Sequence, residues 1–335
     1  MPLGMAVVGT GRWGKQHARI LSESRRARLR WICDASPAAL AALSKRLDGC
    51  RTTENLDEVL SDPEVAAVVV AVPSPHHHSV ARKVIESGRH CFVEKPLALT
   101  VRDAEDLRDL AAKHSRIVMV GHLLLYHPAY RFVADLVTSG KCGRVYYLHS
   151  RRTNLGVIRP DENAWWSLAP HDVSVAIDVF GGAPETVSAS GGAWIQKGVE
   201  DTVFAVLKWA DGRLAQVHVS WLDPHKKREL TVVSSEKMVV WDDMNAQEMV
   251  RVYDRGVDKK VDFQSYAEYV SIRSGDAWLP AISMQEPLQL ELEHFVDSIE
   301  KGTVPRTSVQ TGVDVVRVLA AGQRSLARNG APEAV

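Results

Sequence analysis

The fold of this chain is decided by Met5-Ala6-Val7-Val8-Gly9-Thr10-Gly11-Arg12-Trp13-Gly14-Lys15, where an apolar strand runs directly into a Gly-x-Gly-x-x-Gly turn. In a dinucleotide-binding turn each glycine has its own task. Gly9 allows the tight exit from the strand, Gly11 lets the backbone approach a pyrophosphate, and Gly14 lets the next helix pack close to the sheet. The anion would lie at the N-terminus of that helix, where N–H groups and the positive end of the helix dipole converge.

A second apolar strand supports this interpretation. Residues 29–33 are followed by Asp34, about 20 residues beyond the last glycine. An acidic side chain at this position accepts hydrogen bonds from the adenosine ribose hydroxyls and repels a 2′-phosphate. The sequence therefore predicts a bound dinucleotide, and NAD in preference to NADP.

Length and composition bound the class of protein. The 335 residues suggest two domains, and Lys+Arg and Asp+Glu both number 41, so no net field attracts nucleic acid or a membrane surface. The longest uncharged apolar run, residues 65–72, is far shorter than the ~20 residues of a membrane span and is typical of a strand buried on both faces.

The chain is expected to be cytoplasmic. The first strand begins almost at once, which leaves no room for a signal peptide. The cysteines lie far apart with no CxxC, which predicts reduced thiols and neither a zinc site nor a disulfide framework. They are Cys33, Cys50, Cys91 and Cys142.

Strands alternate with helices through the first third of the chain. This order predicts βαβ units, a mostly parallel sheet and a dinucleotide-binding domain over residues 1–122. Beyond those already named, the predicted strands are 65–72, 90–93 and 117–120, and the predicted helices are 38–47, 55–60, one that ends at Glu86, and 101–114.

The pattern changes after Gly143 to short alternating apolar runs, with a hairpin signal at Asp211-Gly212. We expect an α/β protein whose second domain, residues 123–335, is built on a large, mostly antiparallel open-faced sheet. One helix, 171–180, precedes most of that sheet, and helices at 288–299 and 312–327 return toward the first domain. The predicted strands are 145–149, 186–189, 202–209, 214–221, 230–234, 238–242 and 249–253.

Four features occur in a fixed order along the chain: the glycine turn, Pro73 followed by His77, Glu94-Lys95-Pro96, and His171-Asp172. In this order the sequence resembles the glucose–fructose oxidoreductase / inositol dehydrogenase / MocA-like (Gfo/Idh/MocA) family, from the first strand to the final helices. The resemblance implies an oxidoreductase that acts on CH–OH groups, with Lys95 at the carboxyl edge of the sheet, facing the nicotinamide and the substrate.

A lysine in that place has a physical purpose. Hydride loss from a carbinol carbon also requires its hydroxyl proton to leave, and a cation beside the oxygen stabilises the developing alkoxide. Pro96 restricts the conformation of Lys95 and so fixes its exit from the strand.

The resemblance implies His171 as the second catalytic residue, placed at the start of a helix beside the sugar. Neutral histidine is a suitable proton acceptor at physiological pH. Members of the family commonly carry an aspartate where this chain has Ser167, so His171 would act without that carboxylate, or Lys95 would be the base instead. Asp172 is expected to be a helix-terminal charge.

The run His76-His77-His78 is not expected to bind metal, because consecutive residues cannot all face one ion. The resemblance places His77 near the nicotinamide end and Tyr126 in the substrate pocket, with core packing as the alternative for Tyr126. The predicted cofactor-binding residues are Gly9, Thr10, Gly11, Arg12, Trp13, Gly14, Asp34, Val72, Pro73, His77, Glu94 and Lys95.

Residues 151–159 and 163–172 resemble the subgroup of UDP-N-acetylglucosamine and UDP-N-acetylglucosaminuronate 3-dehydrogenases. A UDP-sugar brings two phosphate charges, which Arg151, Arg152 and Arg159 could neutralise. The alternative is a basic surface loop with core tryptophans. The predicted substrate-binding residues are Tyr126, Arg152, Asn154, Arg159, Trp165, Trp166 and His171.

The leading hypothesis is an NAD-dependent dehydrogenase that oxidises C3 of a UDP-linked acetamido sugar, with UDP-N-acetylglucosamine favoured over its uronate. An NADPH-dependent ketoreductase working in reverse is opposed by Asp34, and a dinucleotide-sensing regulator is opposed by the presence of both Lys95 and His171. Apolar strands at 203–209 and 214–221 predict a homodimer or homotetramer formed through the sheet.

Overall fold

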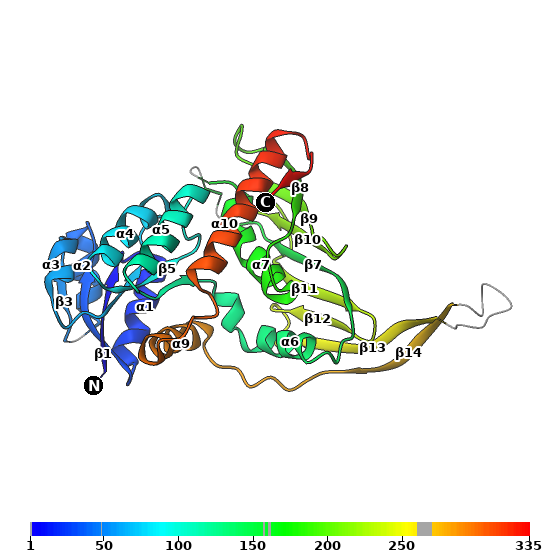
Figure 1. The fold of residues 1–335 in the computed structure, drawn as a ribbon, viewed down its shortest axis with the longest axis horizontal. Helices are drawn as coiled ribbons and strands as arrows, with labels where there is room; N and C mark the ends of the chain where they lie inside the picture. Colours follow the sequence, from blue (N-terminus) through cyan, green and yellow to red (C-terminus); the bar gives the residue numbers. More distant parts are fainter. Residues whose placement is uncertain (1, 48, 157, 160–161, 260–269) are drawn as a thin grey trace. The chain divides into compact units, whose positions relative to one another are not determined.

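A computed structural model of the chain describes residues 2–47, 49–156, 158–159, 162–259 and 270–335. The chain divides into two compact units (Figure 1). Unit 1 comprises residues 1–126 and 285–316, and unit 2 comprises residues 127–284 and 317–335. Unit 1 therefore extends four residues beyond the expected boundary at 122 and includes a helical segment from near the C-terminus.

Unit 1 is built on a six-stranded sheet in the order β3-β2-β1-β4-β5-β6, with all neighbouring strands parallel. This is the order of a doubly wound dinucleotide-binding fold. The central strands are apolar because both faces are covered, and every residue of β4 is fully buried. The strands are β1 (Leu3–Val8), β2 (Ala27–Cys33), β3 (Arg51–Thr53), β4 (Ala67–Val70), β5 (His90–Glu94) and β6 (Val118–Gly121).

The helices of unit 1 begin where local chemistry supplies a start signal. The Thr100 hydroxyl accepts a hydrogen bond from the Asp103 N–H at 3.1 Å, and the Ser36 hydroxyl caps the helix that Pro37 opens. The helices are α1 (Arg12–Glu23), α2 (Pro37–Ser44), α3 (Leu56–Ser61), η1 (Ser74–His76), α4 (His77–Glu86), α5 (Val101–Lys113), η2 (Leu123–Tyr126) and α9 (Pro287–Lys301).

Unit 2 is built on a nine-stranded sheet in the order β14-β13-β12-β11-β7-β10-β9-β8-β15. The expected antiparallel sheet is confirmed, except that β7 and β10 run parallel. The β13–β14 hairpin extends away from the rest of this sheet (Figure 1). The strands are β7 (Val145–Thr153), β8 (Thr186–Gly192), β9 (Thr202–Lys208), β10 (Leu214–Ser220), β11 (Lys227–Ser234), β12 (Met238–Asp242), β13 (Val250–Lys259), β14 (Val270–Trp278) and β15 (Glu333–Ala334).

The helices of unit 2 include α6 (Pro128–Thr138) and α7 (Ala164–Phe180), and α10 (Val309–Ala327) begins in unit 1 and ends in unit 2. Helix α7 packs against β7, β9 and β10. Asn163 caps its start by accepting the Trp166 N–H at 3.1 Å, and Gly181, with φ at 76°, ends it.

Helix α7 corrects the expected start at His171. It begins at Ala164, so His171 lies about two turns inside it and Pro170 is an interior residue. Proline normally favours a helix start. Here the packing of the earlier turns outweighs the lost hydrogen bond, because Ala164, Trp165 and Ala169 are all fully buried.

Three further differences from the expected elements concern unit 2. Helix α6 and strands β14 and β15 are absent from the sequence prediction, and β7 continues from the expected end at His149 to Thr153.

In the described part of the chain, no helix is both long and apolar enough to cross a membrane. The four cysteines are free thiols, as expected.

Candidate active site

The glycine turn has the geometry that the sequence predicts. Gly9 has φ at 94°, and a side chain there would meet the Ala71 carbonyl oxygen at 2.5 Å. A Cβ on Gly14 would lie 1.8 Å from the Gly9 carbonyl oxygen, so the helix packs against the turn only because Gly14 has no side chain. A Cβ on Gly11 would meet nothing within 4 Å, which leaves open space beside the first turn of α1.

That open space fits the pyrophosphate of a dinucleotide. Gly11 is the N-cap of α1 and makes no side-chain cap, so N–H groups of the first turn remain available to an anion. Gly11 and Arg12 are exposed, and Trp13 is half-buried. The fit therefore rests on the backbone of the turn and the helix N-terminus.

Asp34 lies beside the turn at the end of β2. Its Oδ2 accepts hydrogen bonds from the Thr10 N–H at 2.6 Å and from the Thr10 hydroxyl at 2.7 Å, and its Oδ1 accepts the Ser36 N–H at 2.9 Å. Partial burial raises the pKa of Asp34, but the bonds from Thr10 and Ser36 and the charge of Lys15 outweigh it and lower the pKa. The carboxylate is therefore ionised at neutral pH and can accept a ribose hydroxyl.

His77 joins the ends of two strands and is almost fully buried. Its Nδ1 lies 2.7 Å from the Pro96 carbonyl oxygen, and its Nε2 lies 2.9 Å from the Val72 carbonyl oxygen. Burial lowers its pKa despite these carbonyl contacts. With 2% of its surface exposed, His77 fixes the backbone around Val72 and Pro96. Pro73, which directly follows Val72, is exposed.

The other two histidines of the run do not form a metal site. His76 is exposed, and the Nε2 of His78 lies 2.8 Å from the Asp106 carboxylate. In the parts of the chain that the structure describes, no group of three or more His, Cys, Asp or Glu side chains is arranged to hold a metal ion.

Glu94 is the last residue of β5, Lys95 and Pro96 follow it, and the Lys95–Pro96 peptide bond is cis. Glu94 is buried, with 8% of its surface exposed. Its Oε1 lies 2.8 Å from the His17 Nε2, and its Oε2 accepts the Lys95 N–H at 3.2 Å. Lys95 itself is half-buried.

His171 lies in unit 2 on α7, one turn after Ser167, and is half-buried. The next residue, Asp172, is buried, and both of its oxygens contact Arg152 of β7, at 2.7 Å and 3.3 Å. The expectation that Asp172 is a helix-terminal charge is therefore wrong, because it lies inside the helix in a buried ion pair.

The arginines expected to neutralise phosphates are separated in the structure. Consecutive residues of a strand point to opposite faces, so Arg151 and Arg152 cannot bind the same diphosphate. Arg151 pairs with Asp223 at 2.7 Å, and Arg152 is held by Asp172. Arg159 is exposed and pairs with Glu162 at 2.7 Å.

Two aromatic residues predicted to bind substrate lie in the core. Trp165 is fully buried and its Nε1 donates to the Leu319 carbonyl at 2.9 Å, so it cannot cover a sugar face. Tyr126 has 6% of its surface exposed, with its hydroxyl 3.2 Å from the Thr307 hydroxyl, which corresponds to the core-packing alternative. Trp166 and Asn154 are half-buried.

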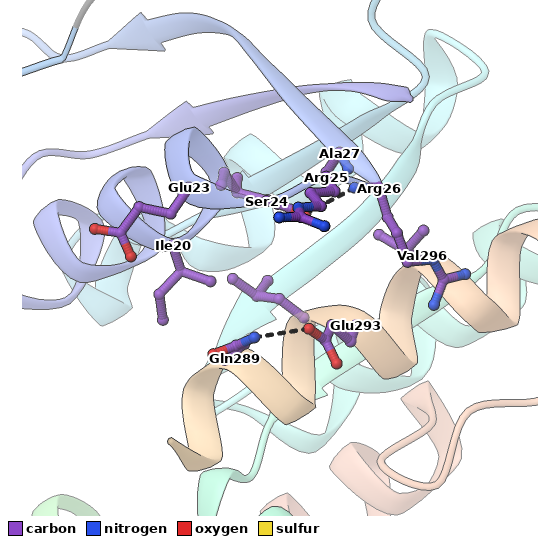
Figure 2. A pocket seen from close by; sticks show the side chains of 11 residues that line it. Ile20, Glu23, Ser24, Arg25, Arg26, Ala27, Gln289, Glu293 and Val296 are labelled. Carbon is purple, nitrogen blue, oxygen red and sulfur yellow. Dashed lines mark hydrogen bonds between the residues drawn. The ribbon is translucent and has the colours of Figure 1, made fainter. Parts of the chain in front are cut away.

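A groove of about 500 Å³ in unit 1 lies between the end of α1 and α9 (Figure 2). Its lining includes Ile20, Leu21, Leu292 and Val296 and shares no residue with the glycine turn, Asp34 or Lys95. The dinucleotide turn and this groove are therefore separate features.

Three buried ionisable residues of unit 1 were not identified from the sequence: His17, His122 and Glu291. Burial, followed by the charge of Lys95, lowers the pKa of His122 to about 3, so His122 lies within electrostatic reach of the lysine. His17 follows the glycine turn by three residues, and that spacing is the one sequence signal that could have drawn attention to it. Nothing local marks Glu291.

The comparisons with known proteins agree with this architecture. Residues 3–122 match the oxidoreductase family with an NAD-binding Rossmann fold, and residues 130–240 match the Gfo/Idh/MocA C-terminal domain. The structure of GenD2 from gentamicin A biosynthesis, solved in complex with NAD, is 26% identical with a TM-score of 0.82, covering 100% of this chain and 96% of that one.

Two curated relatives show the range of activities among similar proteins. The chain is 29% identical over 228 residues to 2,7-anhydro-N-acetylneuraminate hydratase of Mediterraneibacter gnavus, a match that covers 64% of this chain and 60% of that protein. It is 25% identical over 319 residues to UDP-N-acetylglucosamine 3-dehydrogenase of Acidithiobacillus ferrooxidans, which covers 94% and 93%.

Both halves of the chain match the same family, and the glycine turn, Asp34 and Lys95 lie in one unit with the geometry of a dinucleotide site. The chain belongs to the Gfo/Idh/MocA oxidoreductase family, whose N-terminal domain is an NAD-binding Rossmann fold.

Proposed function

We propose that this protein is an NAD-dependent dehydrogenase that oxidises the C3 hydroxyl of a UDP-linked 2-acetamido sugar, with UDP-N-acetylglucosamine as the first choice. The observation that carries the dehydrogenase chemistry is Lys95, which follows a strand of the same parallel sheet as the dinucleotide turn. The sugar rests on the similarity to the UDP-N-acetylglucosamine 3-dehydrogenase along 94% of this chain.

The reaction separates a hydride and a proton. NAD, held by the glycine turn and Asp34, would supply the acceptor for the hydride of C3. Lys95 stabilises negative charge on the C3 oxygen, and His171 accepts the hydroxyl proton, so that the hydroxyl becomes the carbonyl of the 3-keto sugar. His77 supports this by fixing the Pro96 carbonyl beside Lys95.

The proposed contacts with substrate in unit 2 take burial and ion pairs into account. Arg152 binds Asp172, so it is not proposed as a phosphate contact. Trp165 is buried, so it is not proposed as a substrate contact. Trp166, Asn154 and the exposed Arg159 remain as proposed contacts. The family position of an acidic residue is Ser167, so His171 works without a carboxylate one turn before it.

We also propose a homodimer or homotetramer that buries one face of the unit 2 sheet. Tyr147, Phe204, Val206 and Leu214 alternate with buried residues on β7, β9 and β10 and are 39–50% exposed. Phe204 and His218 stack with their ring centroids 4.1 Å apart on neighbouring strands. A large apolar surface of this kind favours a second copy as its cover.

A cytoplasmic location stays a prediction.

The test is NADH formation by the purified full-length chain with UDP-N-acetylglucosamine, its uronate and 2,7-anhydro-N-acetylneuraminate. We expect the highest kcat/KM with UDP-N-acetylglucosamine. A preference for the uronate of ~10-fold or more, about 1.4 kcal/mol of transition-state binding, would reverse the choice of sugar. Turnover of the anhydro sugar alone would overturn the nucleotide-sugar proposal.

A further inference from the structure

A buried cluster of ionisable side chains in unit 1 is centred on Glu94, the residue before Lys95. His17 of α1 is fully buried and contacts the Glu94 Oε1 through its Nε2, and the Glu94 Oε2 accepts the backbone N–H of Lys95. Gly121 lies opposite Glu94 on β6, and a Cβ there would be 3.1 Å from the Glu94 Oε2. The glycine therefore leaves room for the carboxylate.

A second buried carboxyl group lies on α9, whose Phe295 packs against Phe92 of β5 with the ring centroids 5.8 Å apart. Glu291 is fully buried, and among the described residues neither of its oxygens has a hydrogen-bond partner. Burial and then the charge of Glu94 raise the pKa of Glu291 well above its usual value. Two buried carboxylates whose charges interact in this way cannot both be ionised without a large cost.

The two carboxyl groups therefore differ in charge. Burial raises the pKa of Glu94, but the hydrogen bond and charge of His17, followed by the charge of Lys95, outweigh it and lower the pKa. Glu94 has partners for its negative charge, and Glu291 has none among the described residues. The groups that face Glu94 from the surrounding elements are His17 on α1, His77 on α4, Lys95 after β5, His122 after β6 and Glu291 on α9.

We propose that His17 and Glu94 form a positioning pair for Lys95, in which Glu94 carries a single negative charge under the lysine and Glu291 stays neutral. The role of Lys95 itself rests on the proposed function. Glu94 holds the backbone of Lys95 through the N–H and attracts its side-chain cation, and His17 keeps that carboxylate ionised and oriented. The histidine acts through Glu94 and does not touch substrate.

The pair is tested by the pH dependence of kcat in three variants, with NAD and UDP-N-acetylglucosamine as substrates. His17→Leu leaves Glu94 without its partner, so Glu94 becomes neutral at low pH and ionises only as the pH rises. We expect kcat relative to the wild type to fall ~10-fold or more at about pH 6 and to return to within ~3-fold at about pH 9.

The other two variants separate charge from packing. His17→Gln keeps an N–H donor near the Nε2 position and should retain the wild-type pH profile. Glu94→Gln is neutral at every pH and should be impaired throughout. An equal loss for His17→Leu at both pH values, or wild-type activity of Glu94→Gln, would overturn the proposal.

A measurement without substrate keeps the inference separate from the proposed function. In the cofactor-free full chain, amide hydrogen exchange at Lys95 should accelerate in Glu94→Gln and in His17→Leu at about pH 6, and remain slow in His17→Gln. Unchanged exchange in all three variants would refute the positioning role even if the enzyme turns over. Wild-type protein inactive on all sugars, with the expected exchange pattern, would refute the proposed function alone.

Glu291→Gln is the matched control for the charge assignment. Because the amide imitates a protonated carboxyl group, this variant should keep the wild-type pH profile of kcat and slow exchange at Lys95. A shifted profile, or accelerated exchange at Lys95, would show that Glu291 carries the charge and would overturn the assignment.

Discussion

The guanidinium of Arg152 donates two hydrogen bonds to the carboxylate of Asp172, from Nε to Oδ2 at 2.7 Å and from Nη2 to Oδ1 at 3.3 Å. The pair joins β7 to α7 at the residue that follows His171. Both side chains are largely buried, 11% and 6% exposed, so the pair fixes the rotation of the helix that bears His171.

Arg152→Met leaves the buried carboxylate of Asp172 without its cation. We expect a loss of ~3–5 kcal/mol of unfolding free energy, measured by thermal denaturation, with most of it restored in the Arg152→Met/Asp172→Leu double variant. Arg151→Met is the matched control, because Arg151 is 40% exposed in its pair with Asp223 and should cost no more than ~1 kcal/mol. If the Arg152→Met variant is as stable as the Arg151→Met variant and differs from the wild type only in a higher KM, then Arg152 contacts the substrate.

Gly11→Val and Gly14→Ala are expected to fail in different ways. A Cβ on Gly11 would have open space around it, so the variant should fold normally and lose NAD binding because the pyrophosphate space is filled. A Cβ on Gly14 would collide with the Gly9 carbonyl, so Gly14→Ala should be destabilised by at least ~1–3 kcal/mol. Fluorescence titration with NAD and a melting curve of each variant distinguish the outcomes. Normal NAD affinity in Gly11→Val would remove the pyrophosphate from this turn.

Asp34→Ala should shift the cofactor preference from NAD toward NADP. The carboxylate, ionised at neutral pH, repels a 2′-phosphate, and its removal should reduce the NAD/NADP ratio of kcat/KM by ~10-fold or more. Affinity for NAD should also fall, because the Thr10 N–H and hydroxyl lose their acceptor. An unchanged ratio would show that Asp34 does not face the ribose.

Lys95→Met and His171→Asn should affect kcat with different pH dependence. Loss of the cation should lower kcat at least ~100-fold at every pH. Loss of the titrating base should flatten the acidic limb of the pH–rate profile. If the limb persists in His171→Asn and disappears in Lys95→Met, lysine is the base. NAD binding should change little in either variant, since the glycine turn and Asp34 are untouched.

The free energy of unfolding of the Glu291→Gln variant should increasingly exceed that of the wild type as the pH rises. The folded-state pKa of Glu291 is raised, so the native state binds a proton that the unfolded state releases above its usual value of 4.5. Stability is therefore lost as pH rises from that value toward the folded pKa, by up to ~1.4 kcal/mol per pH unit, and the amide removes this loss. Glu293→Gln, at a half-buried residue of the same helix, is the control and should show no such trend. A constant difference from pH 5 to pH 8 would contradict a buried neutral Glu291.

The sequence by itself determined the dinucleotide half of this protein. Strand β1, the glycine turn and Asp34 are linked by short stretches of chain, so their spacing specifies the turn, the helix and the acidic residue together. The alternation after Gly143 likewise predicts the unit 2 sheet, because period-two burial is a local property of each strand.

Only the tertiary structure decided which polar side chains face inward. The sequence predicts cofactor contacts at His77 and Glu94, and in the structure both side chains are buried within the protein. Trp165 and Arg152 are held by Leu319 and Asp172, partners that lie 154 and 20 residues away along the chain. The charge state of Glu291 depends on Glu94, from a distant strand. Such pairings follow from which surfaces pack together, and no local pattern of residues encodes them.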